Sequence, residues 1–255
     1  MIRQPVVAGL FYPEDPSELA GAVDALLHQA DSEPASGLRG LVAPHAGYVY
    51  SGPVAATAFA LAPRTARVAL LGPSHFVPLD GLAVSGADSW ATPLGEVPVA
   101  ADLREAAVAA GAVVDDLPHT REHALEVELP FLQRACAGRL EILPVAVGRA
   151  SAEYVAALIE AVDALVVVST DLSHYHDAAT ARRLDGVTAD AVVRREASAI
   201  HSDAACGVFA LRGLVEHARR ADLAVELLDL RTSADTAGEP ERVVGYGAFA
   251  VRGVA

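Results

Sequence analysis

Four side chains able to bind a metal or move a proton follow three short apolar runs of this sequence. They are His45 after residues 40–43, His75 after residues 68–72, and Asp171 with His174 after residues 164–169. Such runs, rich in β-branched residues and bounded by Pro or Gly, are typical of buried strands in a parallel or mixed sheet. Ligands of open α/β sheets bind just beyond the carboxyl ends of these strands. Three imidazoles and one carboxylate at one sheet edge therefore predict a metal site or an acid–base site.

Asp171 and His174 are three positions apart in Ser-Thr-Asp171-Leu-Ser-His174. On a turn, or on the first turn of a helix, positions i and i+3 share a face, so the carboxylate can contact the imidazole. Such a partner fixes the tautomer of a histidine and raises its basicity, which suits a general base or a residue that supports a metal ligand. The alternative is that Asp171 only caps the helix that follows.

Two further segments carry reactive side chains. His123 lies between Glu122 and Glu126 at a predicted helix start, where it either borders the site or belongs to a helix-capping polar cluster. The sequence contains no H-E-x-x-H, so a zinc protease is not supported. Cys206 precedes Gly207 at another predicted helix start, where the helix dipole would favour a thiolate. We interpret Cys206 as a small buried hydrophobic residue.

The elements that must position these residues alternate between short apolar runs and longer amphipathic segments, the pattern of a layered α/β domain. We expect one domain over residues 1–255, with three layers and a mostly parallel or mixed central sheet. The expected strands lie near residues 40–43, 68–72, 81–84, 140–147, 164–169, 225–229 and 243–251. The expected helices cover residues 15–29, 53–61, 100–110, 125–134, 151–162, 177–196 and 202–220. Pro144 suggests that its strand is an edge strand or contains a bulge.

Composition limits the classes of partner. The chain is 53% hydrophobic, and its 19 basic and 33 acidic residues give a net charge of −14. Nucleic acids and anionic membranes bind basic surfaces, so neither is an expected partner. We see no run of about 18 apolar residues and no signal peptide, so no membrane span is expected. The two cysteines, Cys136 and Cys206, fit a reducing compartment without a disulfide framework, and we expect a cytoplasmic protein.

The ordered motifs resemble those of one known family. They are Ala-Pro-His45-Ala-Gly-Tyr, Gly-Pro-Ser-His75, Glu-His123-Ala-Leu-Glu, Ser-Thr-Asp171-Leu-Ser-His174 and Arg231-Thr-Ser. In this order they resemble the MEMO family, whose bacterial branch is also called AmmeMemoRadiSam system protein B. The resemblance extends over nearly the whole chain. It implies a fold similar to the B-type (LigB-like) subunits of class III extradiol dioxygenases, which hold non-heme iron at strand ends.

The same resemblance implies roles for individual residues. His45 and His75 match the two histidine ligands, and Asp171, His174 and His123 match further, catalytic positions of the pocket. Vertebrate members have a pocket cysteine near the C-terminus, whereas extradiol enzymes use a carboxylate as the third ligand. This chain has no cysteine beyond Cys206, so the third ligand would be Asp235, with Thr236 as the neighbouring alternative.

Two classes of function follow from this resemblance. The first is an oxidoreductase in which two histidines and Asp235 hold Fe(II), with copper or zinc as competing ions, for redox or oxygen-dependent chemistry on a small substrate. The second is a non-catalytic binding module whose dioxygenase-like pocket holds a peptide or a small anion. A hydrolytic zinc site is a weaker third possibility, since two histidines and a carboxylate also suit catalytic zinc.

Overall fold

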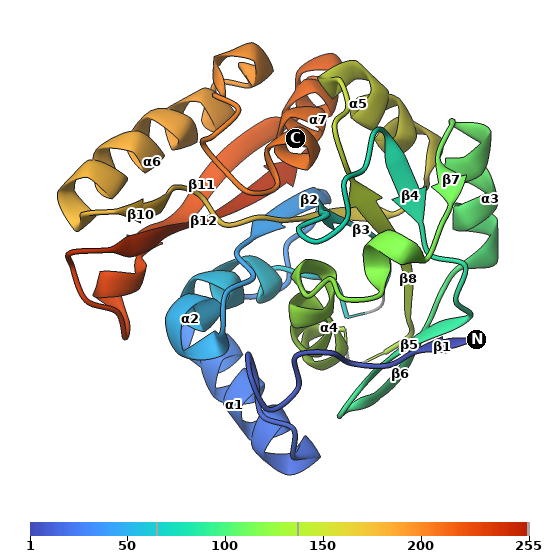
Figure 1. Ribbon diagram of the computed structural model, residues 1–255, viewed down its shortest axis with the longest axis horizontal. Helices are drawn as coiled ribbons and strands as arrows, with labels where there is room; N and C mark the ends of the chain where they lie inside the picture. Colours follow the sequence, from blue (N-terminus) through green and yellow to red (C-terminus); the bar gives the residue numbers. More distant parts are fainter. Residues whose placement is uncertain (65, 137, 254–255) are drawn as a thin grey trace.

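A mixed β-sheet runs through the centre of the protein (Figure 1). The computed structural model describes residues 1–64, 66–136 and 138–253, and within these residues the sheet has nine strands. They are β2 (Leu38–Ala43), β3 (Ala66–Pro73), β4 (Leu82–Val84), β7 (Val113–Val114), β8 (Leu140–Val147), β9 (Leu165–Ser169), β10 (His174–His176), β11 (Ala224–Thr232) and β12 (Val243–Arg252). Their order is β10-β12-β2-β9-β3-β8-β4-β7, and β11 pairs with β12. The four central strands β2, β9, β3 and β8 are parallel.

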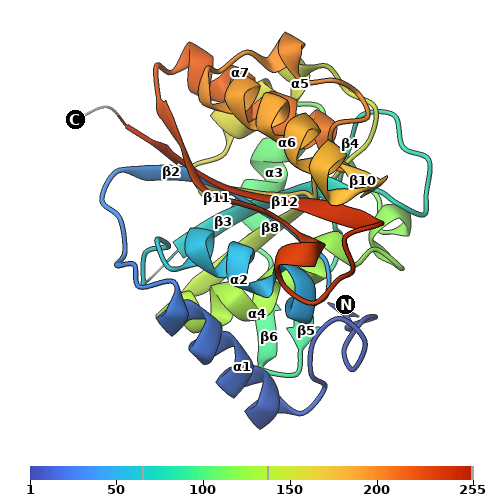
Figure 2. The same ribbon diagram turned by 90° about the vertical axis from the view of Figure 1, so that its left-hand side faces the viewer.

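Helices cover both faces of this sheet (Figure 2). One layer contains α1 (Pro16–Gln29), α2 (Tyr48–Phe59) and α4 (Ala124–Ala135). The other contains α3 (Ala101–Ala109), α5 (Ala152–Ala161), α6 (Ala178–Val193) and α7 (Val208–Arg220). The predicted three-layer α/β fold is therefore confirmed. In the described part of the chain, no helix combines the length and the apolar character needed to cross a membrane.

Side-chain alternation explains why the central strands are almost entirely apolar. Along β2, Leu41 packs into the apolar cluster beneath α1, α2 and α4, while Val42 packs into the cluster beneath α5 and α7. Along β9, Val167 and Val168 divide in the same way. Since successive side chains of a strand point to opposite faces, a strand covered on both faces has no solvent side for polar residues.

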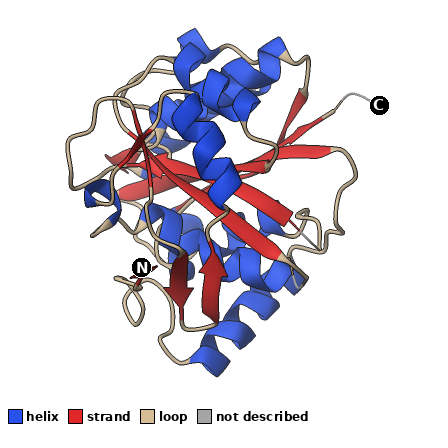
Figure 3. Ribbon diagram, turned by 90° about the vertical axis from the view of Figure 1, so that its right-hand side faces the viewer, coloured by secondary structure: helices blue, strands red, loops and turns tan. Residues whose placement is uncertain are grey.

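A second, smaller sheet lies below the large one (Figure 3), and α4 packs against it. It consists of β1 (Ile2–Arg3), β5 (Ser89–Thr92) and β6 (Gly95–Pro98). The guanidinium of Arg3 lies 4.4 Å from the ring centroid of the buried Trp90 and forms an ion pair with Glu126 of α4. These contacts fix the first residues of the chain against the helix that begins beside His123.

The prediction for Pro144 was wrong, because β8 lies between β3 and β4 rather than at an edge, and its pairing with both neighbours has no bulge. The pairing of β4 with β8 ends at Val145, one residue from Pro144. The carbonyl of Pro144 accepts a hydrogen bond from Ser85 N, so the side of Pro144 that lacks an N–H faces the end of the short β4. The sheet therefore tolerates this proline without losing a bond to β3.

The predicted starts of two helices were also wrong. The helix expected from Pro53 begins at Tyr48, and Pro53 lies inside α2. The helix expected from residue 202 begins at Val208. There, Cys206 N donates to Asp171 O (3.2 Å) and Gly207 N donates to Thr170 Oγ1 (2.8 Å), so these residues bond to the loop after β9 instead of to a helix.

Candidate metal centre

The ends of three parallel strands bring the predicted histidines together. β9 lies between β2 and β3, so His45, Asp171 and His75 follow neighbouring strands at the same edge of the sheet. The ring centroids of His45 and His75 are 5.4 Å apart. One small ion can contact both rings at this separation.

His123, at the start of α4, completes a group of three imidazoles. Its ring stacks on that of His75 with centroids 4.9 Å apart, and its centroid lies 5.5 Å from that of His45. The ring of His123 therefore lies against the rings of both His45 and His75. Its pKa is lowered, first by burial, so the ring favours the neutral form.

Glu122 fixes the orientation of His75. Its buried carboxylate accepts hydrogen bonds from His75 N (2.6 Å) and lies 2.8 Å from His75 Nδ1. It also accepts from the backbone N–H groups of His123 and Ala124, both at 3.0 Å. Burial raises the pKa of Glu122, but the bonds from His75 more than offset this and leave the pKa below its ordinary value. A carboxylate on Nδ1 leaves Nε2 of His75 free to bind a metal.

Cys206 is the residue that the sequence analysis did not assign to the site. Its Sγ lies 3.3 Å from His45 Nε2, and the ligand atoms of His45, His75 and Cys206 all lie within 4.8 Å of one another. Gly207 makes this approach possible, because a Cβ there would meet Thr170 Cβ at 2.8 Å and Ser169 O at 2.9 Å. The Cys-Gly pair is thus a local signal, but nothing in the sequence places it beside β9.

The thiol of Cys206 and the imidazole of His45 are both neutral in this environment. Burial, and then the nearby Asp171, raises the pKa of the Cys206 thiol to about 12. Burial, and then His75, lowers the pKa of His45 well below its ordinary value. A neutral imidazole is ready to bind a metal, and a bound metal ion would displace the thiol proton.

Asp171 and His174 form one wall of the pocket without bonding to each other. Asp171 Oδ1 accepts a hydrogen bond from His45 N (2.9 Å), and burial raises the pKa of this carboxyl to about 7. His174 lies on β10, not on a turn or helix, and its Nδ1 is 2.7 Å from Leu172 O. Because a carbonyl only accepts, Nδ1 carries the proton and Nε2 is an acceptor. Among the described residues, no hydrogen bond joins Asp171 to His174.

Asp235 lies in a different environment from the histidines. It belongs to a short 3₁₀ helix, η3 (Ser233–Asp235), and its carboxylate accepts bonds from Thr232 N (2.8 Å), Thr232 Oγ1 (2.9 Å) and Arg182 Nη2 (2.7 Å). The hydroxyl of Thr236 donates to Ser233 O (3.1 Å). In the described part of the chain, the third ligand atom close to His45 and His75 belongs to Cys206.

A pocket of about 490 Å³ opens over Asp171, His174 and His123. Its rim contains Leu10, Tyr50, Tyr175 and Arg242. The Arg242 guanidinium lies 4.4 Å from the ring centroid of Tyr175, and in the described structure it forms no ion pair. The volume suits a small molecule, and the lining combines apolar and aromatic side chains with a few polar groups.

Comparison with known proteins identifies the family of this chain. A family model described as "Memo-like protein" matches residues 3–250. The chain belongs to this family. A MEMO1 family protein of Aquifex aeolicus is 34% identical, with 96% of this chain and 97% of the relative aligned. The MEMO1 family protein Mbar_A1422 of Methanosarcina barkeri is 32% identical, with 98% of this chain and 100% of the relative aligned. The resemblance to the MEMO family is therefore confirmed.

Proposed function

We propose that this member of the Memo-like family binds one redox-active transition-metal ion, iron(II) or copper, through His45, His75 and Cys206. The ion would serve redox or oxygen-dependent chemistry on a small substrate in the pocket above it. The observation that carries the proposal is the meeting of two imidazoles and one thiol within 4.8 Å, each supplied by a different part of the chain. The acidic net charge and the absence of paired cysteines fit a cytoplasmic enzyme acting on a small molecule.

The residues fit a metal ion in spacing and in chemistry. Ligands about 2.1 Å (nitrogen) and about 2.3 Å (sulfur) from one ion lie about 3.6 Å apart at a tetrahedral angle. The 3.3 Å between His45 Nε2 and Cys206 Sγ is close to this value. His45 is neutral and its Nδ1 is occupied by Ser169, so Nε2 is the nitrogen available for a metal.

The thiol changes which metals compete for the site. Two imidazoles with a hard carboxylate suit Fe(II), whereas a thiolate is a soft ligand that favours copper and zinc. Copper therefore competes with Fe(II) more strongly for a site that has Cys206 as the third ligand than for a site that has Asp235. A redox-active ion would supply electron transfer and an open position for oxygen or substrate.

The chain's own contribution is to position a substrate and to move protons. Asp171, with a pKa of about 7, exchanges a proton near neutral pH. His174 presents an acceptor Nε2 toward the same pocket, because its Nδ1 is held by Leu172 O. His123 borders both the histidine group and the pocket. These three residues are therefore the candidates for acid–base roles.

One observation favours the alternative of a non-catalytic binding module. Arg242 lines the pocket over Tyr175 and forms no ion pair among the described residues. A cation held over an aromatic ring at a pocket mouth suits an anionic group on a peptide or a small molecule. The binding-module function would use the same pocket without redox chemistry.

Metal titration tests the choice between these functions. Anaerobically purified protein would be titrated with Fe(II), Cu(I) and Zn(II) separately by calorimetry, and its as-purified metal content would be measured. We expect one ion per chain in the wild type and no stoichiometric binding by His45→Ala or His75→Ala. Equal binding by the wild type and both variants would exclude this centre. Wild-type binding of Zn(II) alone would exclude redox chemistry and leave the binding module or a hydrolytic site.

A further inference from the structure

Ser169, the last residue of β9, connects the metal-binding histidine to a buried glutamate. Its hydroxyl oxygen lies 2.7 Å from His45 Nδ1, 2.8 Å from Ala124 O and 2.7 Å from Glu128 Oε1. All four groups are buried, and Glu128 is 0% exposed. Neither the metal site nor the substrate pocket described above uses Glu128.

Counting hydrogens decides how these contacts are made. A serine hydroxyl has one proton to donate and two lone pairs to accept with. Ala124 O is a carbonyl and only accepts, so the Ser169 proton goes to it. Ser169 has no second proton to give, so His45 Nδ1 carries the ring proton and donates to Ser169. The remaining contact, between Ser169 Oγ and Glu128 Oε1, then requires a proton on Glu128.

The surroundings of Glu128 favour the same state. Its second oxygen, Oε2, has no hydrogen-bond partner among the described residues. An ionised carboxylate with one bare oxygen in an apolar interior is costly, whereas a neutral acid is not. The nearby titratable groups are Asp171 and Tyr48, and neither is a cation. Burial is the main cause that raises the pKa of Glu128 well above its ordinary value.

We infer that Glu128 is a neutral carboxylic acid that donates its proton to Ser169 and, through Ser169, holds His45 with Nε2 toward Cys206. Glu128 is therefore a positioning residue for the metal ligand. Its protonation stands independently of any metal, while its effect on binding rests on the proposed function. Outer hydrogen-bond partners of metal-binding histidines typically change metal affinity about 10–100-fold when removed.

Infrared spectroscopy of the metal-free protein tests the protonation directly. The carbonyl stretch of a protonated carboxylic acid would be compared between wild type and Glu128→Gln at about pH 8, where Asp171 is mostly ionised. We expect a protonated-acid band in the wild type that is missing from Glu128→Gln. Identical spectra in this region would overturn the inference, whatever the protein does with metals.

Metal titration of two variants tests the positioning role. The amide of Glu128→Gln can donate to Ser169 as the acid does, whereas Glu128→Leu fills the space without a donor. We expect Glu128→Gln to bind the metal within about 3-fold of wild type and Glu128→Leu to bind about 10-fold more weakly. Equal loss in both variants, or none in either, would overturn the role. If the wild type binds no metal while the infrared band is present, the proposed metal function fails and the protonated Glu128 remains.

Discussion

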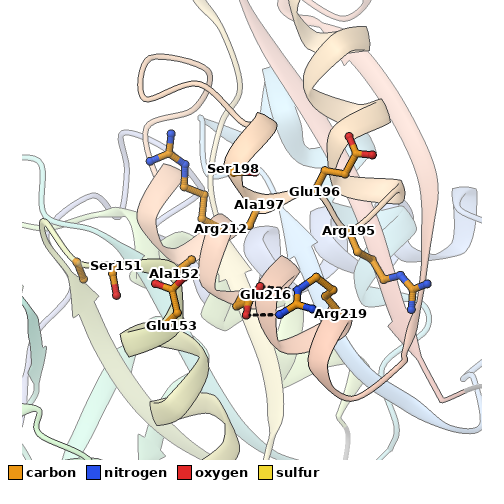
Figure 4. A pocket seen from close by; sticks show the side chains of 11 residues that line it. Ser151, Ala152, Glu153, Arg195, Glu196, Ala197, Ser198, Arg212, Glu216 and Arg219 are labelled. Atoms are coloured by element: carbon orange, nitrogen blue, oxygen red, sulfur yellow. Dashed lines mark hydrogen bonds and ion pairs between the residues drawn. The ribbon is translucent and has the colours of Figure 1, made fainter.

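This molecule has two hollows, and the larger of them has the simpler chemistry. The hollow between α5, α7 and the segment after α6 has a volume of about 620 Å³, against about 490 Å³ for the histidine pocket. Figure 4 shows that the side chains of Arg195 and Arg212 point away from each other. The carboxylate of Glu216 accepts bonds from Arg219 (2.8 and 2.9 Å) and Arg220 (2.8 Å).

The contrast favours convergence of buried polar groups, and not volume, as the mark of the candidate functional site. In the larger hollow the charges neutralise one another, and the hydrogen bond from Arg219, not burial, is the first cause that lowers the pKa of Glu216, to about 2. In the pocket over Asp171, His174 and His123 the polar groups are buried. They have too few proton donors and opposite charges around them to neutralise one another. Burial then shifts their pKa values, as for Asp171 and His174, which is typical of functional sites.

The largest expected effect comes from removing the thiol of the metal centre. We predict that Cys206→Ser loses more than about 100-fold in metal affinity, since a ligand matters more than its hydrogen-bond partners. Cys136→Ser is the matched control, because Cys136 is also buried but is not among the potential metal ligands of the described residues. Calorimetric titration of both variants measures the difference. Equal affinity in the two variants would remove Cys206 from the centre.

A smaller effect is expected from the carboxylate that orients His75. In Glu122→Gln, one oxygen is replaced by an NH₂ group that faces backbone N–H donors, so the bonds to His75 N and Nδ1 cannot both be kept. We predict metal affinity about 10–100-fold below wild type. Asp235→Asn, tested in the same titration, separates the two carboxylates. If Asp235→Asn weakens binding more than Glu122→Gln does, Asp235 is the ligand that the resemblance implies.

The sequence was sufficient for the sheet and for two of the three candidate metal ligands, because both depend on local signals. Apolar runs bounded by Pro and Gly predict buried strands, and parallel neighbours place His45 and His75 at one edge. Cys206 could not be placed in this way. It reaches His45 because the segment before α7 bonds to the loop after β9, a contact between residues far apart in the chain.

Asp235 shows how far an argument from motif order reaches, and its role as a metal ligand stays a prediction. Order along the chain suggests a ligand near the C-terminus, but the contacts of a carboxylate depend on its neighbours in space. Here Arg182 and Thr232 bind Asp235. Pro144 illustrates the same limit for the fold, since a short neighbouring strand permits a proline inside the sheet.

The protonated Glu128 makes the stability of the fold depend on pH. Burial raises the folded-state pKa of Glu128 well above 4.5, so its stabilising contribution is present below about pH 4.5 and is lost as pH rises toward the folded pKa. Glu128→Gln cannot ionise. As pH rises through this range, the free energy of unfolding of Glu128→Gln should therefore increase relative to that of wild type by about 1.4 kcal/mol per pH unit.

Urea unfolding of both proteins between about pH 5 and about pH 8 measures this gain. Asp171, Asp185 and Tyr48 are present in both proteins, so their titration largely cancels in the difference. A difference that does not change with pH would contradict the raised pKa of Glu128.

The smallest effect is expected from a substitution in the larger hollow. Arg219→Gln removes one exposed partner of Glu216, which keeps its bond from Arg220 (2.8 Å). The Arg219 side of this pair is exposed, the buried Glu216 keeps Arg220 as a counter-charge, and no histidine or cysteine lines this hollow among the described residues. We predict unchanged metal affinity and an unfolding curve that coincides with wild type within error. A loss of metal affinity in Arg219→Gln, at a charge with no contact to the histidines, would mean that the two hollows are coupled and that the comparison drawn from their local chemistry is wrong.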